Sequence, residues 1–323
     1  MNIPYTDSNL NYLGRWTNYG TSKGSGWQGV QVRFKVSGTL NLAVNVDVQD
    51  LSGSDVSGVI TNIDSGNYTQ ILTTSLADIY TGIKTANFTL PDTGEHTVIL
   101  KFSNYPNLQW NGTGRCRLMS LDIDAGGSVT PWVKTTGRLL GCVGDSWMAT
   151  ANDWPFLMAQ TKYWLYPISF GGARASTLDS QFNYDNSATL NTSDPTLDVV
   201  IVNSSVNDYI GGVSLSSFNT SFAALVDKIR TKQPTAKIIL LQSPRNTRDG
   251  QTYDQYGPKM EIIAAARSNV VYVPCPSSVW STLEWATGDP YHLSFAGRQT
   301  LAAYVEGQLD LLYEAKSRGY IIC

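Results

Sequence analysis

Apolar and polar residues follow different patterns in the two parts of the chain. In the first part they alternate, and Val30–Val36 reads Val-Gln-Val-Arg-Phe-Lys-Val. This two-residue period is typical of a β-strand with one buried face. Gly, Asn, Asp and Ser separate further stretches of this kind, which favours a β-sandwich or jelly roll. We predict strands at residues 30–36, 40–48, 68–73, 83–90, 97–102 and 117–123.

The pattern changes at residues 125–131, where two glycines, small polar residues and a proline mark a boundary. Beyond it, short continuous apolar runs alternate with segments of helical period. That order indicates a parallel β-sheet with helices on both faces. The sequence therefore predicts an all-β domain at residues 1–130 and an α/β domain at residues 131–323. In the second domain we expect strands at 138–143, 163–168, 197–203, 236–242 and 270–274, and helices at 148–161, 217–231, 255–268 and 295–315.

Composition and charge argue against several classes of partner. Hydrophobic residues make up 42% of the 323 residues, charged residues 15%, and the formal net charge is −3. Because no Lys/Arg cluster occurs, we expect no nucleic-acid partner, and no apolar run is long enough to cross a membrane. The four cysteines are scattered without metal-ligand spacing, and we expect Cys142 and Cys275 to be buried thiols. His96 begins a predicted strand, and we expect it at the surface.

Polar residues able to do chemistry follow four of the predicted strands. In a parallel sheet these positions meet at one edge, where α/β proteins bind their ligands. The stretches are Gly144-Asp145-Ser146, Gly171-Gly172, Val206-Asn207-Asp208 and Asp289-Pro290-Tyr291-His292.

Ser146, His292 and Asp289 have the residue types of a nucleophile, a general base and a carboxylate that orients the base. A serine is a nucleophile only when a base removes its proton, and His292 is the single histidine of the second domain. Asp289 lies three residues before it, a spacing that lets a carboxylate reach the imidazole in a tight turn. Taken alone, Ser146 is equally typical of a helix N-cap, His292 of a surface histidine and Asp289 of a turn. Together they favour a catalytic triad.

Acyl transfer also needs hydrogen-bond donors for the oxyanion that develops on the substrate. The candidates are the backbone N–H of Ser146, a backbone N–H of Gly171 or Gly172, and the side-chain amide of Asn207. Glycine lets the main chain approach a substrate closely, but a plain turn is an alternative for the glycine pair. A helix cap is the alternative for Asn207.

The four stretches together resemble the sequence blocks of the SGNH hydrolases, also called GDSL-type esterases. The matches are Ser146 in the nucleophile block, Gly172 in the glycine block, Asn207 in the asparagine block, and Asp289 with His292 in the Asp-x-x-His block. The resemblance covers roughly residues 137–319. It implies a flavodoxin-like three-layer α/β/α fold and a serine esterase mechanism with no metal and no cofactor. Trp147, where members usually have Leu, and Ser205, where many have Gly, depart from the pattern without removing a catalytic group.

A β-sandwich ahead of such a domain is similar to carbohydrate esterase family 2 and to polysaccharide deacetylases of bacteriophage tails. This resemblance implies that the protein removes small acyl groups, above all O-acetyl, from a carbohydrate. It also implies a secreted or virion-associated protein, although the chain shows no signal peptide. Bulky aromatic residues would narrow the acyl pocket or stack on a sugar, and two arginines would contact acidic sugars if they are not in surface salt bridges. These candidate substrate contacts are Trp147, Arg174, Tyr209, Arg245, Trp285 and Tyr291.

Two other functions remain open at this point. One is a general or lipolytic esterase, or a thioesterase, of the same fold. The other is a carbohydrate-binding virion protein whose hydrolase domain is inactive. A preference for acetyl over long-chain esters would separate the first from a deacetylase, and the presence of all four blocks argues against the second.

Overall fold

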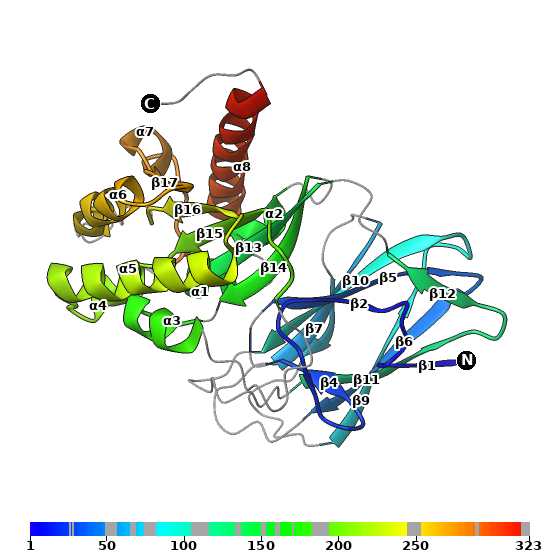
Figure 1. Cartoon of the computed structure of the whole chain (residues 1–323). Helices are drawn as coiled ribbons and strands as arrows, with labels where there is room; N and C mark the ends of the chain where they lie inside the picture. The colour runs from blue at the N-terminus through cyan, green and yellow to red at the C-terminus, as the bar shows by residue number, and fades with distance from the viewer. Residues whose placement is uncertain are drawn as a thin grey trace. The chain divides into compact units, whose positions relative to one another are not determined.

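The computed structural model of the chain describes residues 1–25, 27, 29–48, 57–64, 69–73, 82–104, 116–132, 137–149, 153–158, 162–169, 171–182, 194–243, 253–287 and 291–317. Its residues form two compact units, each made of several segments (Figure 1). The first, here called the β unit, consists of Met1–Thr135, Tyr166–Ser169 and Tyr184–Pro195. The second, the α/β unit, consists of Thr136–Leu165, Phe170–Asn183 and Thr196–Cys323.

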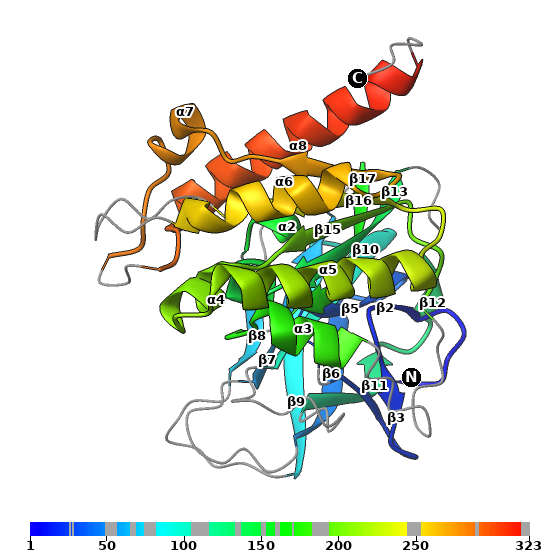
Figure 2. The same ribbon diagram turned by 60° about the vertical axis from the view of Figure 1, so that its left-hand side comes forward.

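The β unit contains two antiparallel sheets (Figure 2). One has the strand order β3-β4-β11-β6-β9 with β1 beside β11, and the other has the order β12-β5-β10-β7-β8 with β2 beside β5. The strands are β1 (Asn2–Pro4), β2 (Asn11–Leu13), β3 (Thr17–Asn18), β4 (Lys23–Gly24), β5 (Val30–Ser37), β6 (Asn41–Val48), β7 (Ser57–Ile63), β8 (Thr69–Thr73), β9 (Gly82–Thr89), β10 (His96–Asn104), β11 (Cys116–Ile123) and β12 (Ser128–Pro131).

The alternation of residue types along the strands decides which face of each sheet is buried. On β6, Leu42, Val44 and Val46 are at most 1% exposed and belong to the apolar core of the unit. Asn41 and Asn45, between and before them, are exposed or half-buried because successive side chains point to opposite faces. The β-sandwich predicted from this period is confirmed. The strands β1–β4, β7 and β12 were not predicted, and all of them except β7 are only two to four residues long.

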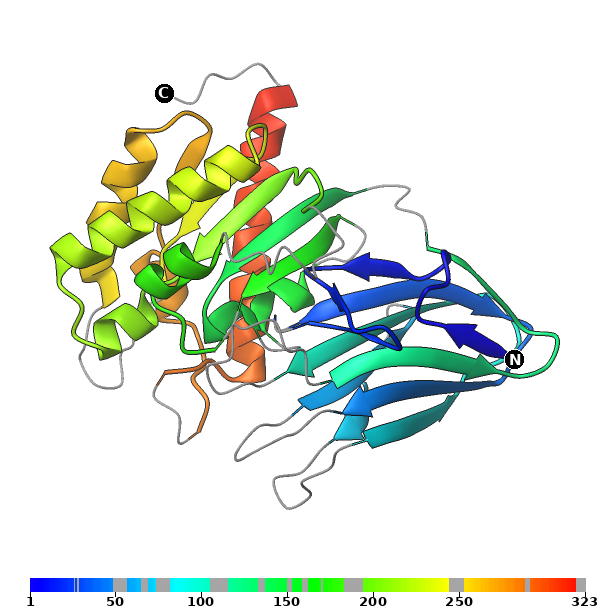
Figure 3. The ribbon, with the colours of Figure 1, turned by 60° about the horizontal axis from the view of Figure 1, so that its bottom comes forward.

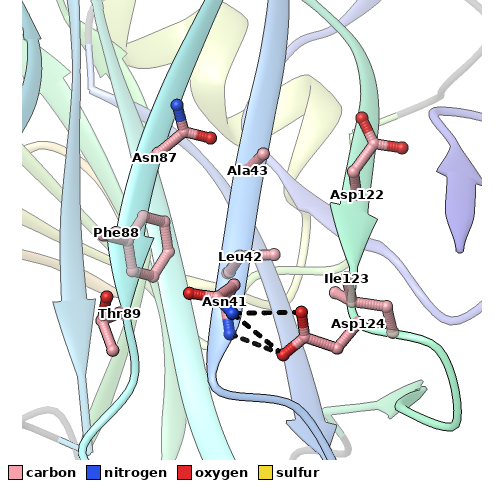
Figure 4. A pocket seen from close by; sticks show the side chains of 9 residues that line it. All are labelled: Asn41, Leu42, Ala43, Asn87, Phe88, Thr89, Asp122, Ile123 and Asp124. Atoms are coloured by element: carbon pink, nitrogen blue, oxygen red, sulfur yellow. Dashed lines mark hydrogen bonds between the residues drawn. The ribbon is translucent and has the colours of Figure 1, made fainter.

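A shallow pocket of about 390 Å³ lies on β6, β9 and β11 and the residue that follows β11 (Figure 4). At its rim the Asp124 carboxylate accepts hydrogen bonds from the Asn41 amide, from the backbone N–H groups of Leu40 (2.9 Å) and Asn41 (3.0 Å), and from Thr39 Oγ1 (3.0 Å). These donors, the Asn41 amide first, lower the pKa of Asp124 to about 2. The carboxylate thus ties the start of β6 to the end of β11.

His96 lies in the structure where the sequence did not predict it. It is 5% exposed, so the predicted surface position is wrong. Its Nδ1 lies 2.5 Å from Asp64 Oδ2, and its Nε2 lies 3.1 Å from Asp92 Oδ1. The pairing of β10 with β7 brings Asp64 beside the histidine, a partner 32 residues away that local sequence does not reveal. Burial of His96 is therefore compensated by polar partners on both ring nitrogens.

The α/β unit contains a five-stranded sheet of order β14-β13-β15-β16-β17, although the last four residues of its edge strand β14, Tyr166–Ser169, belong to the β unit. Numbered along the chain this is 2-1-3-4-5, the flavodoxin-like order, and the ladders β13–β15, β15–β16 and β16–β17 are parallel. Helices α3, α5 and α6 cover one face and α8 the other (Figure 3). The elements are β13 (Arg138–Gly144), α1 (Ser146–Ala149), α2 (Trp154–Leu157), β14 (Tyr163–Ser169), α3 (Ala175–Phe182), β15 (Val199–Asn203), α4 (Val206–Ile210), α5 (Leu215–Lys232), β16 (Lys237–Leu241), a 3₁₀ turn (Tyr253–Tyr256), α6 (Gly257–Ala265), β17 (Val270–Val273), α7 (Ser277–Trp280) and α8 (Phe295–Ser317).

The central strand β15 explains why the sheet needs a helix layer on each face. All five of its residues are buried. Val199 and Ile201 share a core cluster with Leu301 and Leu309 of α8. The residues between them face the other side of the sheet, where the apolar stripe of α5 is fully buried. The three-layer fold that the resemblance implied is therefore present.

The helix predicted at residues 148–161 is wrong. Two separate short helices occupy parts of this range, α1 and α2, and Asp153 between them is extended (φ −74°, ψ 161°). Pro155 lies in the first turn of α2, where its missing N–H costs nothing, whereas inside a longer helix it would break a hydrogen bond. The sequence therefore starts a helix at this proline instead of continuing one.

Candidate active site

Ser146 lies at the carboxyl end of β13, in a turn that the preceding residues close tightly. The Oδ1 atom of Asp145 accepts a hydrogen bond from the Trp147 N–H (3.0 Å), and the Asp145 carbonyl accepts one from the Met148 N–H (3.0 Å). Gly144 has no room for a side chain, since a Cβ there would lie 2.4 Å from the Asn203 carbonyl oxygen. These contacts place Ser146, half-buried, at the first position of α1.

The structure brings Ser146 and His292 together across 146 residues of sequence. His292 Nε2 lies 2.8 Å from Ser146 Oγ, a hydrogen-bond distance. A base at this distance can take the hydroxyl proton when the oxygen attacks an electrophile. Sheet topology alone led us to expect the two residues at one edge.

Backbone contacts hold the segment that carries His292 against the residues that follow α7. Leu293 forms an isolated antiparallel bridge with Trp285, and the His292 carbonyl accepts a hydrogen bond from the Ala286 N–H (3.0 Å). Helix α8 begins two residues after Leu293. Gly297 in its first turn passes so close to the Glu284 carbonyl that a Cβ would lie 2.1 Å from that oxygen. These backbone contacts fix the position of the short segment that carries the His292 imidazole.

An ion pair next to this segment was not anticipated from the sequence. Arg298 donates through Nε to the Leu293 carbonyl (3.0 Å), and its Nη1 lies 3.5 Å from Asp153 Oδ1. Asp153 is 3% exposed. The pair joins the start of α8 to the start of α2, and no short sequence motif marks it.

Asn207 lies in the first turn of α4, directly after β15. Its Nδ2 atom is buried and finds no hydrogen-bond partner in the described part of the chain. Buried donors are nearly always paired, so an unpaired one needs an explanation. An amide that waits for an acceptor on a ligand is one explanation, and it agrees with the oxyanion role expected from the sequence.

The glycine pair follows β14. Gly172 has φ +77° and is exposed, with no atom within 4 Å of a Cβ built on it, whereas Gly171 is half-buried and has no positive φ. A left-handed backbone of this kind favours glycine. The conformation identifies Gly172 as the residue that makes the turn, and the choice between the two as oxyanion donor stays a prediction.

Two carboxyl groups are buried beside these residues. Asp145 is 0% exposed, and burial raises its pKa to about 7 although the Trp147 N–H acts in the opposite direction. The Asn207 amide also lowers this pKa, but it lies outside hydrogen-bond geometry. Asp208 is 1% exposed, and burial raises its pKa to about 6, opposed by the hydrogen bond from the Ala175 N–H. Perturbed carboxyl groups of this kind gather at functional sites.

The expected substrate contacts have different surroundings. Trp147 is 4% exposed and packs edge-on against Trp285 with a centroid distance of 5.9 Å, so its ring is part of the core. Trp285, Tyr209 and Tyr291 are half-buried and pack against the same core cluster. Arg174 is exposed, and its guanidinium fills the space beside Gly211 on α4.

Two predicted residues lie outside the described residues. They are Asp289, the expected third member of the triad, and Arg245. Both stay predictions. Cys142 and Cys275 are buried, as expected, and burial raises the pKa of both thiols.

The described ranges contain no group of three or more His, Cys, Asp and Glu side chains placed to hold a metal ion. Over the same ranges, no helix is long and apolar enough to cross a membrane.

Comparison with known proteins agrees with this geometry. Residues 142–300 match the model of the GDSL-like lipase/acylhydrolase family. This range contains Ser146, Gly172, Asn207 and His292. The α/β unit therefore carries a GDSL/SGNH hydrolase domain. No curated protein sequence matches the chain significantly.

Solved structures share the fold over nearly the whole chain. A family two carbohydrate esterase from Clostridium thermocellum, in complex with cellohexaose, has a TM-score of 0.72 at 16% identity, covering 97% of this chain and 100% of its own. A salicylyl-acyltransferase from a tetracycline biosynthetic pathway has a TM-score of 0.69 at 15% identity, covering 97% of both chains. An acetyl xylan esterase from the rumen bacterium Butyrivibrio proteoclasticus has a TM-score of 0.68 at 13% identity, covering 99% of both. A strand-rich N-terminal region followed by a GDSL/SGNH domain is thus a fold that known esterases and an acyltransferase share.

Proposed function

We propose that the protein is a serine esterase that removes O-acetyl groups from a carbohydrate. The observation that carries the proposal is the 2.8 Å contact between Ser146 Oγ and His292 Nε2 inside a GDSL acylhydrolase domain. Such a pair is what nucleophilic catalysis by serine requires.

The reaction proceeds in two halves. Ser146 Oγ attacks the ester carbonyl carbon while His292 takes the hydroxyl proton. The bond from this carbon to the sugar oxygen then breaks, the sugar oxygen takes the proton from His292, and an acyl-serine remains. Water attacks the acyl-serine with His292 again as base, which releases the acid and restores Ser146. Asp289 is the carboxylate proposed to orient His292.

The oxyanion of each tetrahedral intermediate is held by the Ser146 N–H, the Gly172 N–H and the Asn207 amide. The unpaired, buried Nδ2 of Asn207 supports this assignment, because a donor without a partner in the free enzyme has its hydrogen bond to give in the transition state. The position of Ser146 at the start of α1 supports the first donor.

The substrate class rests on the surroundings of the site and on the fold. Tyr209, Trp285 and Tyr291 are half-buried, Tyr209 and Tyr291 lie within two residues of Asn207 and His292, and Trp285 is bridged to Leu293. We expect their rings to border the site and to stack on a sugar. The names of two fold neighbours, a carbohydrate esterase bound to cellohexaose and an acetyl xylan esterase, point the same way. We expect the protein to act on a carbohydrate outside cells or on a virion.

The test is acetate release from p-nitrophenyl acetate and from acetylated xylan, by wild-type protein and by Ser146→Ala, with a chelator present. We expect chelator-resistant activity that Ser146→Ala lowers by at least about 10³-fold. Ser216→Ala, an exposed serine of α5, is the matched control and should keep full activity. Equal activity of wild type and Ser146→Ala would refute the serine mechanism.

Two further measurements separate the related functions. Preference for long-chain acyl esters over acetyl esters would overturn the deacetylase assignment in favour of a lipolytic esterase. Appearance of the acyl group on an added alcohol, with little free acid, would favour an acyltransferase, as the name of one fold neighbour suggests.

A further inference from the structure

The donors proposed for the oxyanion come from loops that are far apart in the sequence. Gly172 follows β14, and Asn207 follows β15 on the other side of β13. Their N–H groups act on one oxygen only if the two loops keep a fixed separation. A contact between the loops is therefore needed, and the structure contains one.

Asp208 makes this contact. Its Oδ2 accepts a hydrogen bond of 2.9 Å from the backbone N–H of Ala175, the first residue of α3. Asp208 directly follows Asn207, and Ala175 lies three residues after Gly172. The carboxylate thus caps the N-terminus of α3 from α4, an arrangement that the helix dipole favours.

Arg174 strengthens the same connection. Its charge attracts the Asp208 carboxylate, and its guanidinium lies so close to Gly211 at the end of α4 that a Cβ there would be 2.4 Å from Nη2. Arg174 and Ala175 are consecutive. Two neighbouring residues that follow Gly172 therefore contact α4 and the glycine at its end.

Joining two loops through a buried carboxylate costs stability. Asp208 is 1% exposed, and its Oδ1 has no hydrogen-bond partner within the described ranges. Burying a charged oxygen without a full set of hydrogen-bond partners lowers the stability of the fold. An apolar contact between the loops would not have this cost. Unlike an apolar contact, the hydrogen bond to a carboxylate fixes the orientation of the backbone N–H that it binds, here that of Ala175.

We propose that Asp208 is a positioning residue that holds the Gly172 loop on α4, so that the Gly172 N–H and the Asn207 amide converge on one oxyanion. This inference rests on the proposed esterase function. It assigns Asp208 no contact with substrate.

The test compares Asp208→Ala with Asp208→Asn in steady-state hydrolysis of p-nitrophenyl acetate. Alanine removes the acceptor of the Ala175 N–H, and we expect kcat to fall about 10²-fold with KM changed less than about twofold, because the oxyanion exists only after binding. Asparagine keeps a carbonyl oxygen as acceptor at nearly the same volume. It should retain kcat within about fivefold of wild type, since the charge itself takes no part in the reaction.

Asp179→Ala is the matched structural control. Asp179 pairs with Lys228 of α5 at 2.6 Å and so anchors the middle of the same helix α3. Its loss should lower the thermal stability without changing kcat. A purely structural role of Asp208 would make Asp208→Ala behave like this control.

The outcomes are distinguishable. If Ser146→Ala is as active as wild type, the esterase proposal fails. If Ser146→Ala is inactive but folded Asp208→Ala keeps the wild-type kcat, the positioning role is refuted. If Asp208→Ala does not fold, Asp208→Asn decides, because more than tenfold loss of kcat would overturn the role and wild-type kcat would support it.

Discussion

Two sets of polar groups, Asp124 and His96 in the β unit and Asp145, Asn207 and Asp208 at the carboxyl edge of the α/β sheet, differ in how completely they are hydrogen-bonded. In the β unit, Asp124 accepts hydrogen bonds from three residues, and its pKa is about 2. His96 has a partner on each ring nitrogen, and the hydrogen bond to Asp64 comes first among the causes that raise its pKa. Neutral donors stabilise the charge of Asp124, and Asp64 and Asp92 stabilise the charge of His96, so these contacts hold neighbouring strands together.

At the carboxyl edge of the α/β sheet, by contrast, burial of polar groups is not matched by hydrogen bonds. Asp145 Oδ2, Asp208 Oδ1 and Asn207 Nδ2 are buried without a hydrogen bond in the described part of the unit. The pKa values of the two carboxyl groups rise to about 7 and about 6, because burial outweighs their donors. A fold that optimised stability alone would not leave these atoms unpaired.

The difference teaches how to separate supporting from functional polar residues. Hydrogen bonds that are complete in the free protein stabilise the fold, whereas donors left unpaired at the ligand-binding edge of a sheet are available to a transition state. Three tests address this distinction, in order of decreasing effect.

The largest effect is expected from comparing Asn207→Ala with Asn41→Ala. Loss of an oxyanion donor should lower the turnover of Asn207→Ala by about 10²–10³-fold, without the loss of a hydrogen bond that Nδ2 makes in the described part of the chain. Asn41→Ala should keep full turnover and lose stability, because its amide binds Asp124. Steady-state kinetics and urea unfolding measure both. Reversed behaviour of the pair would break the distinction.

The second effect is a change in the pH dependence of stability in Asp145→Asn. A carboxyl whose pKa rises from 3.8 to about 7 on folding makes the protein less stable as pH rises from about 4 to about 7. Asparagine cannot ionise and keeps an acceptor for the Trp147 N–H. The variant should therefore gain on the order of 2 kcal/mol relative to wild type at pH 8, less than the full pKa shift implies because relaxation relieves part of the burial cost. At pH 4.5 the gain should be only a fraction of this, because most of the loss in wild type occurs between pH 4.5 and 7.

Urea unfolding at the two pH values measures this gain. Asp227→Asn is the control, since Arg267 lowers the pKa of Asp227 and the carboxylate stabilises the fold above its unfolded pKa. That variant should lose stability at pH 8. Parallel pH profiles of wild type and Asp145→Asn would contradict the burial of an unsatisfied carboxyl group.

The smallest effect is expected from His96→Gln, with the opposite dependence on pH. A raised pKa means that the charged histidine stabilises the fold at pH below 6.5 and that this contribution is lost as pH rises through the folded pKa. Asp64 is 46% and Asp92 72% exposed, so solvent weakens both pairings, and the loss in the variant should be about 0.5–1 kcal/mol at pH 5 and smaller at pH 9. Thermal unfolding at the two pH values checks it. A larger loss at pH 9 would contradict the charge pairing.

The comparison also explains which features the sequence predicted. Continuous apolar runs such as Val199–Asn203 fix a parallel sheet, and a parallel sheet brings the residues after its strands to one edge. That reasoning placed Ser146 near His292, and the two lie 2.8 Å apart. It needed no knowledge of side-chain contacts.

Features that depend on distant partners were missed or mistaken. The contact of Asp208 is with a backbone N–H 33 residues away, and the partner of His96 is 32 residues away. Neither has a local signature. The long helix predicted after Ser146 is wrong for a local reason. The prediction did not take into account that Pro155 favours the start of a helix over its continuation.

The most direct test of the account is covalent labelling of the protein with an organophosphorus fluoride, which reacts with an activated serine through an oxyanion-like intermediate. Digestion and mass spectrometry should find one adduct, on Ser146. In folded His292→Ala the labelling rate should fall by at least about 10³-fold, because the base is gone. Labelling of another serine, or an unchanged rate in His292→Ala, would contradict the assignment of Ser146 and His292 as nucleophile and base.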